Sequence, residues 1–150
     1  MLLKKTAVVV FLFFFLSVAA HAVPDVSAQS AALIDVDSGS LLYGKNENKR
    51  LPMASTTKIM TSLLALEAGM PNKTVTVTED MVRVEGTSMG LLPGDIVTLK
   101  TLVYGMLLES GNDAANTTAN VLAGSLGDFA LRMNNRAREI GMINTSFVTP

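Results

Sequence analysis

The sequence contains no cysteine and no tryptophan among its 150 residues, and its single histidine, His21, lies near the N-terminus. Without cysteine the chain forms no disulfide, thiolate nucleophile or thiolate metal site. His21 falls in a segment that we expect to be removed, so the mature chain would also lack a Ser-His-Asp triad and a histidine-ligated zinc. Proton transfer must then use Lys, Asp, Glu or Tyr, and we expect no metal and no cofactor.

The first 22 residues have the pattern of a secretory signal peptide. Lys4 and Lys5 precede an almost unbroken apolar run over residues 6–20, and Ala20-His21-Ala22 supplies the small-x-small pattern of a signal-peptidase site. The run is shorter than the roughly 20 residues that span a bilayer. We therefore predict export with cleavage after Ala22, and an uncleaved anchor is the alternative.

The charge balance argues against a nucleic-acid partner. The formal net charge of the whole chain is −1, and removal of Lys4 and Lys5 makes it more negative. A chain without an excess of basic residues lacks the electrostatic footprint that phosphate backbones require. Residues 23–150 are expected to form a mildly acidic globular domain.

Periodicity and turn signals predict a mixture of strands and helices. Residues 31–36 are predicted as a buried strand that pairs with residues 40–43 in a hairpin, and residues 74–78 as a short strand. A first helix, with Ile59, Leu63 and Leu66 on its apolar face and Met60 and Leu64 beside them, is expected to end at Gly69. Further helices are predicted over residues 99–108 (capped by Thr98), 113–123 and 127–141, and residues 144–149 resemble the start of another strand.

The S-x-x-K pattern of Ser55-Thr56-Thr57-Lys58 lies where the first helix begins. Residues three apart share a helix face, with Cβ atoms about 5–6 Å apart, so Lys58 Nζ can reach Ser55 Oγ. A neutral Lys58 could remove the proton of a nucleophilic serine. Its pKa must fall from about 10.4, and both the helix dipole and partial burial lower it. The alternative is that Ser55 caps the helix and Lys58 is solvated.

A second pattern, Ser110-Gly111-Asn112, separates two apolar helices and begins 55 residues after Ser55. Glycine at the end of a helix is common, so one interpretation is a simple turn. The other is a loop that presents a hydroxyl and an amide to a cleft between helices.

Together these patterns resemble the signature of the penicillin-recognising serine acyl-transferases, which is S-x-x-K, S-x-N and K-T-G. Within that group the chain is most similar to the low-molecular-weight penicillin-binding proteins, which are D-alanyl-D-alanine carboxypeptidases. The resemblance covers nearly all of residues 29–150. It is carried by residues 31–45, 51–61, 86–89, 92–95, 102–115 and 141–150.

The resemblance implies an α+β, β-lactamase/DD-peptidase-like fold: an antiparallel sheet flanked by helices, with an all-helical lobe around residues 70–140. It implies that Ser55 attacks the penultimate D-alanine carbonyl of a peptidoglycan stem peptide and that Lys58 is the general base. Ser110 would relay a proton to the leaving amine, and Asn112 would hold the substrate backbone and help to position Lys58. β-Lactams would acylate Ser55 as covalent inhibitors.

One family motif, K-T-G, is missing, because the chain ends before the family places it. We expect the sequence to be the N-terminal part of a longer gene product, truncated before the later strands and inactive alone. Membrane association is expected only through a C-terminal anchor outside these residues.

Two alternative functions stay open. The first is a class A-like β-lactamase, which would carry S-D-N, whereas this chain has Gly111 in place of the aspartate. Such an enzyme would also have Asn four residues after a catalytic Glu, whereas here Glu139 is followed at that distance by Ile143. The other alternative is a non-catalytic exported domain that binds β-lactams or peptidoglycan.

Overall fold

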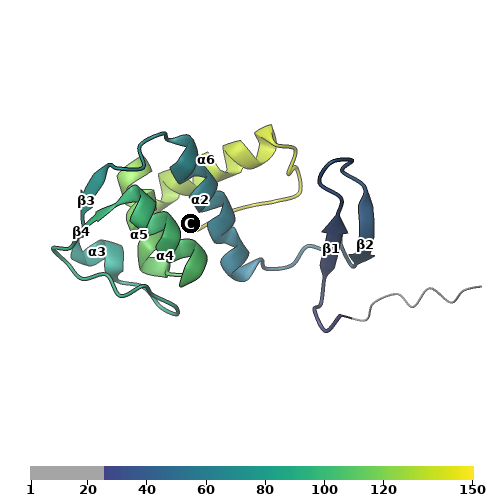
Figure 1. Ribbon diagram of the computed structural model, residues 1–150, viewed down its shortest axis with the longest axis horizontal. Helices are drawn as coiled ribbons and strands as arrows, with labels where there is room; N and C mark the ends of the chain where they lie inside the picture. Colours follow the sequence, from purple (N-terminus) through teal and green to yellow (C-terminus); the bar gives the residue numbers. More distant parts are fainter. Residues whose placement is uncertain (1–25) are drawn as a thin grey trace, which may run out of the picture. The chain divides into compact units, whose positions relative to one another are not determined.

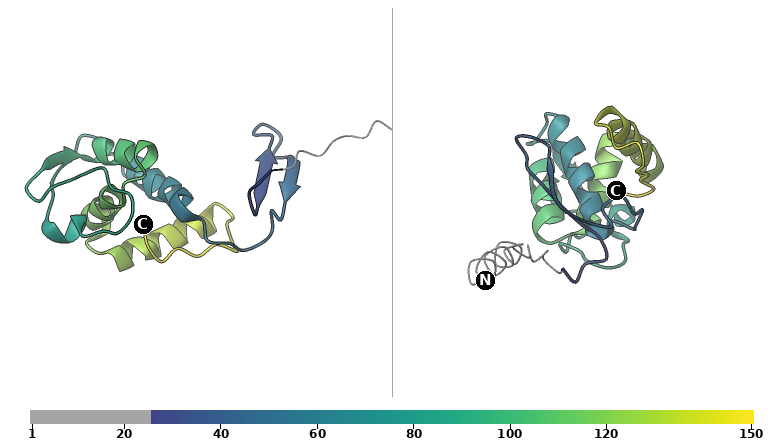
Figure 2. Two further views of the ribbon diagram at one scale, coloured as in Figure 1. Left: turned by 90° about the horizontal axis from the view of Figure 1, so that it is seen from below. Right: turned by 90° about the vertical axis from the view of Figure 1, so that its right-hand side faces the viewer.

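The computed structural model describes residues 26–150, so the predicted signal peptide and its cleavage site lie outside the described residues. The chain divides into two compact units at the Lys49–Arg50 bond (Figures 1 and 2). All four predicted site residues belong to the second unit. Over the described residues, no helix has both the length and the apolarity needed to cross a bilayer.

The first unit contains the predicted hairpin, in which β1 (Ala31–Ile34) pairs antiparallel with β2 (Leu41–Lys45). β1 ends before residue 36 because the Asp35 side chain accepts hydrogen bonds from the backbone N–H and the hydroxyl of Ser38, at 2.7 and 2.6 Å. The predicted burial of this strand is wrong, since Leu33 is 56% and Ile34 54% exposed. Within residues 26–49 the two strands form a sheet of their own, with no helix to cover either face.

The second unit contains a short 3-10 turn, five helices and a two-stranded sheet among its described residues (Figure 1). In chain order these are η1 (Ala54–Thr56), α2 (Thr57–Glu67), β3 (Thr74–Thr76), α3 (Glu79–Val82), β4 (Ile96–Thr98), α4 (Leu99–Leu108), α5 (Asn112–Ala123) and α6 (Leu126–Glu139).

The helix boundaries follow the sequence signals closely. Thr98 caps α4 as predicted, its hydroxyl accepting from the Thr101 N–H at 3.1 Å, and Gly141 follows α6 with a positive φ of 85°. β4 was not predicted, because its three residues become a strand only by pairing with β3. Residues 144–149 are not a strand. Instead, Phe147 is buried, its backbone N–H donates to Asn134 Oδ1, and its carbonyl accepts from Asn134 Nδ2.

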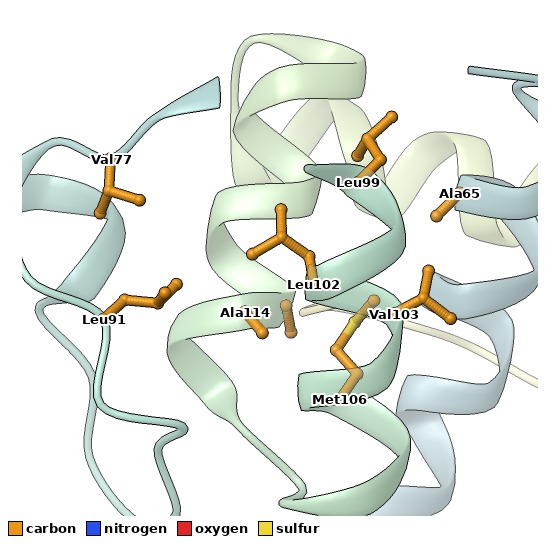
Figure 3. Packing of buried hydrophobic residues seen from close by; sticks show 9 residues of the cluster. Ala65, Val77, Leu91, Leu99, Leu102, Val103, Met106 and Ala114 are labelled. Carbon is orange, nitrogen blue, oxygen red and sulfur yellow. The ribbon is translucent and has the colours of Figure 1, made fainter. Parts of the chain in front are cut away.

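The core of the second unit lies around α4, whose Leu102 and Met106 are almost fully buried. Figure 3 shows these side chains between α2, represented by Ala65, and α5, represented by Ala114. Alanine at those positions allows the three helices to approach closely. A second cluster around Phe129 and Met133 packs α6 against the same bundle.

The buried face of α2 differs in part from the predicted one, because Met60 is buried but Ile59 and Leu66 are not. Ile59 is 62% and Leu66 61% exposed, whereas the buried residues of this helix are Lys58, Met60, Thr61, Ser62 and Ala65. Helical periodicity predicted the helix but not which of its faces is buried, because several of the buried side chains are polar. This orientation places the lysine of the S-x-x-K motif inside the protein.

Candidate active site

Ser55 lies in the 3-10 turn η1, immediately before α2. The interpretation of Ser55 as a helix cap is wrong, because no side chain caps the start of η1 or α2. The preceding residue, Ala54, has a φ of +48°, a left-handed conformation that is strained for a residue with a Cβ. Ser55 is exposed, and its hydroxyl is therefore accessible to a ligand.

Lys58 follows in the first turn of α2, with only 6% of its surface exposed. The interpretation of Lys58 as a solvated residue is therefore wrong. Burial lowers the pKa of Lys58 below its ordinary value, since removal of water disfavours the ammonium form. Among residues 26–150, Lys58 has no hydrogen bond and no ion pair that would hold the charged form. Burial thus shifts Lys58 toward the neutral amine that a general base requires.

Ser110 brings the two sequence motifs together. Its Oγ donates a hydrogen bond to Ser55 Oγ at 2.7 Å, across 55 residues of sequence. Because Ser55 accepts this bond, its own hydroxyl hydrogen can point to another acceptor. Ser110 also has a left-handed φ of +56°. Only three non-glycine residues of the described chain have a positive φ, and two of them, Ala54 and Ser110, adjoin this contact. Backbone strain concentrates at functional sites in this way.

Asn112 begins α5, and both of its nitrogen atoms are engaged. The side-chain Nδ2 donates to the Glu85 carbonyl at 2.6 Å, and the backbone N–H donates to the Thr87 carbonyl at 2.8 Å. The amide orientation is therefore set, and Oδ1 is left as an acceptor for a ligand N–H. Gly86 allows this approach, because a Cβ there would lie 3.2 Å from Asn112 Nδ2.

Asp113 is a site residue that the sequence did not reveal. Its carboxylate is fully buried and accepts from the Ser88 hydroxyl at 2.6 Å and from the backbone N–H groups of Met89, Gly90, Leu91 and Ala114 at 2.9–3.0 Å. Burial alone would raise the pKa of Asp113, but these hydrogen bonds outweigh it and the pKa is lowered. The only sequence signal was an aspartate in the first turn of a helix, since four of its five donors lie 22–25 residues earlier in the chain.

The assembled groups have the chemistry of covalent acyl transfer. An exposed serine hydroxyl is bonded to a second hydroxyl, and a buried lysine whose pKa is lowered lies one helical turn further on. An oriented side-chain amide completes the site. A nucleophile, a base and an orienting group are the components of nucleophilic catalysis.

Comparison with known proteins identifies relatives of this arrangement. The family profile described as D-alanyl-D-alanine carboxypeptidase matches residues 17–150. The D-alanyl-D-alanine carboxypeptidase DacF of Bacillus subtilis is 43% identical over an alignment of 129 residues, which covers 82% of this chain and 33% of that protein.

Solved structures agree with the fold. The D-alanyl-D-alanine carboxypeptidase of Mycobacterium tuberculosis superposes with a TM-score of 0.82 at 35% identity, covering 89% of this chain and 50% of that one. Penicillin binding protein 5 of Haemophilus influenzae gives a TM-score of 0.78 at 30% identity, with coverage of 85% and 39%. The chain thus spans a third to a half of the length of these proteins, and the predicted α+β fold is confirmed. The chain belongs to the D-alanyl-D-alanine carboxypeptidase family.

Proposed function

We propose that the protein is a serine-type D-alanyl-D-alanine carboxypeptidase that removes the terminal D-alanine from peptidoglycan stem peptides. The observation that supports this most strongly is the 2.7 Å hydrogen bond between Ser110 Oγ and Ser55 Oγ. It joins the two motifs at one point, three residues before a buried lysine whose pKa is lowered by burial.

In the proposed acylation step, Ser55 Oγ attacks the carbonyl carbon of the penultimate D-alanine while its proton passes to Lys58 Nζ. The C–N bond of the tetrahedral intermediate then breaks. The proton held by Lys58 reaches the leaving amine through the Ser110 hydroxyl, so D-alanine departs as the neutral amine and an ester remains on Ser55. Asn112 Oδ1 accepts from a substrate amide N–H and orients the peptide. Water then hydrolyses the ester and restores the Ser55 hydroxyl.

The same site would react with β-lactams, because their strained amide presents a comparable carbonyl to Ser55. No cofactor takes part in these steps. We also propose that the protein is exported, with the signal segment cleaved after Ala22, and that residues 23–150 form the first part of a larger catalytic domain. Membrane attachment would depend on a C-terminal anchor outside this sequence.

The test is labelling of the complete gene product with a fluorescent penicillin, followed by peptide mass spectrometry. We expect a long-lived adduct on the peptide containing residues 51–58, release of D-alanine from a peptide ending in D-Ala-D-Ala, and loss of both in Ser55→Ala. Ser62→Ala is the matched control, since Ser62 lies on α2 and its buried hydroxyl has no hydrogen-bond partner within the described residues. This control should keep the label.

The alternatives give different results. An adduct that forms and clears within seconds would favour a β-lactamase. A lasting adduct without release of D-alanine would favour a binding domain. Label that survives in Ser55→Ala would show that another residue is the nucleophile.

A further inference from the structure

Residues 85–91, which we call the clamp segment, bond to the turn that carries Ser110 and Asn112. The Thr87 hydroxyl donates to the Ser110 carbonyl oxygen at 2.6 Å. Asn112 donates its backbone N–H to the Thr87 carbonyl at 2.8 Å and its side-chain Nδ2 to the Glu85 carbonyl at 2.6 Å. Both functional residues of the turn are therefore held by the same short segment.

The clamp segment is itself anchored by one buried side chain. Residues 88–91 each donate a hydrogen bond to the Asp113 carboxylate, through the Ser88 hydroxyl and three consecutive backbone N–H groups. Because the carboxylate is charged and excluded from water, these bonds are stronger than exposed neutral ones. Asp113 follows Asn112 directly, so the anchor and the turn that it serves belong to the start of the same helix.

Ser110 needs an external contact to keep its conformation. Its φ of +56° is unfavourable for a residue with a Cβ, and this conformation directs Oγ to Ser55. A change of φ would swing the Cβ and remove the contact. The Thr87 hydroxyl, bonded to the Ser110 carbonyl, opposes that change.

We propose that Thr87 is a positioning residue that holds Ser110 against Ser55, and that Asp113 keeps Thr87 in place by anchoring residues 88–91. This inference rests on the proposed function. Thr87 acts through Ser110, because its hydroxyl donates its hydrogen bond to the Ser110 carbonyl. Its effect must therefore disappear when the Ser110 hydroxyl is absent.

The test compares Thr87→Val, which has nearly the same shape but no hydroxyl, with Thr87→Ser, which keeps the hydroxyl, in the complete gene product. Acylation by a fluorescent penicillin is resolved into a binding constant and a chemical rate constant. We expect Thr87→Val to slow the chemical step about fivefold, the factor for loss of one neutral hydrogen bond, with binding unchanged. Thr87→Ser should stay within about twofold of wild type.

The control for a general loss of stability is Thr118→Val, because the Thr118 hydroxyl donates to the Ala114 carbonyl at 2.8 Å inside α5 and not to the turn. It should leave the acylation rate unchanged. In a Ser110→Ala background, Thr87→Val should not slow acylation further. If Thr87→Val caused only an independent structural defect, it would slow acylation by the same factor in both backgrounds.

Three results would overturn the proposal: a wild-type rate in Thr87→Val, equal slowing in Thr118→Val, or independent effects in the Ser110→Ala background. A crystal structure of Thr87→Val tests the proposal without an activity measurement. If Ser110 Oγ still lies 2.7 Å from Ser55 Oγ in that variant, the proposal is contradicted. If wild-type protein forms no adduct on Ser55, the proposed function fails. The crystal structure then still tests whether Thr87 positions Ser110.

Discussion

Replacing Asp113 by asparagine is expected to release residues 88–91 before it affects the rest of the second unit. Oδ2 accepts from the Ser88 hydroxyl and from the N–H groups of Gly90 and Leu91, whereas Oδ1 accepts from Met89 and Ala114. In Asp113→Asn with Oδ1 retained, an NH₂ group replaces Oδ2 and faces the Gly90 and Leu91 N–H groups, which cannot accept from it. Those two bonds are lost, the Ser88 hydroxyl must rotate to become an acceptor, and the bonds from Met89 and Ala114 lose their ionic character.

The free-energy cost of Asp113→Asn depends on which of the released donors can reach water. Ser88 and Gly90 are exposed and can be rehydrated, but Leu91 is buried, and its unsatisfied N–H costs about 1–3 kcal/mol. Together with the weaker bonds to Met89 and Ala114, the loss is about 3 kcal/mol, consistent with breaking a buried charged interaction. A change of about 3 kcal/mol in local opening corresponds to exchange about a hundredfold faster.

Hydrogen–deuterium exchange of peptides covering residues 86–92 measures this directly. The matched control is Asp128→Asn, which removes the same charge from an exposed carboxylate that accepts from the Ser125 hydroxyl at 2.8 Å. It should leave exchange in the clamp segment unchanged. Equal protection of residues 89–91 in wild type and Asp113→Asn would refute the assignment of Asp113 as anchor.

The effect has a defined pH dependence. The pKa of Asp113 is lowered in the folded protein, so its carboxylate contributes stability that is present above the ordinary aspartate pKa of about 3.9. That contribution is lost as the pH falls through the folded pKa. The difference in unfolding midpoint between wild type and Asp113→Asn should therefore be constant from about pH 5 to 7 and shrink below about pH 4.

Two further predictions concern Lys58 and Gly111. Because burial lowers the pKa of Lys58, the acylation rate should rise with pH and level off at a pH below about 10.4. Lys58→Arg stays protonated, so its acylation rate should be about a hundredfold lower or more. Stopped-flow acylation measures both, and a rate independent of pH from 6 to 10 would exclude Lys58 as base. At Gly111 a Cβ would lie 3.0 Å from Met89 N and 2.8 Å from Asp113 Oδ1, so Gly111→Ala should destabilise the protein by about 1–3 kcal/mol. Gly127→Ala, with its nearest neighbour 4.0 Å away, should be neutral or stabilising in the same denaturation experiment, and equal losses would contradict the steric explanation.

Local signals predicted much of the fold because they act within a few residues. The Thr98 cap and the glycine after α6 mark helix ends by hydrogen bonds and backbone conformation that neighbouring residues decide. The predicted burial of β1 was wrong, and the predicted apolar face of α2 was wrong in part, for the opposite reason. Which side of an element meets another element depends on residues far away in sequence.

The candidate site shows the same division. Composition excluded histidine and cysteine chemistry from the predicted mature chain, and the spacing of Ser55 and Lys58 on a helical turn made a serine–lysine pair possible. The resemblance carried by the motifs then proposed Ser110 and Asn112. Each of these steps needed only residue type and order, which is why the family could be recognised from sequence.

Tertiary structure decided what those residues can do. The burial of Lys58 depends on the rotation of α2, and the contact between Ser55 and Ser110 joins positions 55 residues apart. Asp113 and its donors in residues 88–91 lie 22–25 residues apart and share no periodic pattern. Sequence by itself determined which groups are available and where the helices begin. Packing alone determined which groups lose water and which meet, since desolvation and hydrogen bonding depend on neighbours in space.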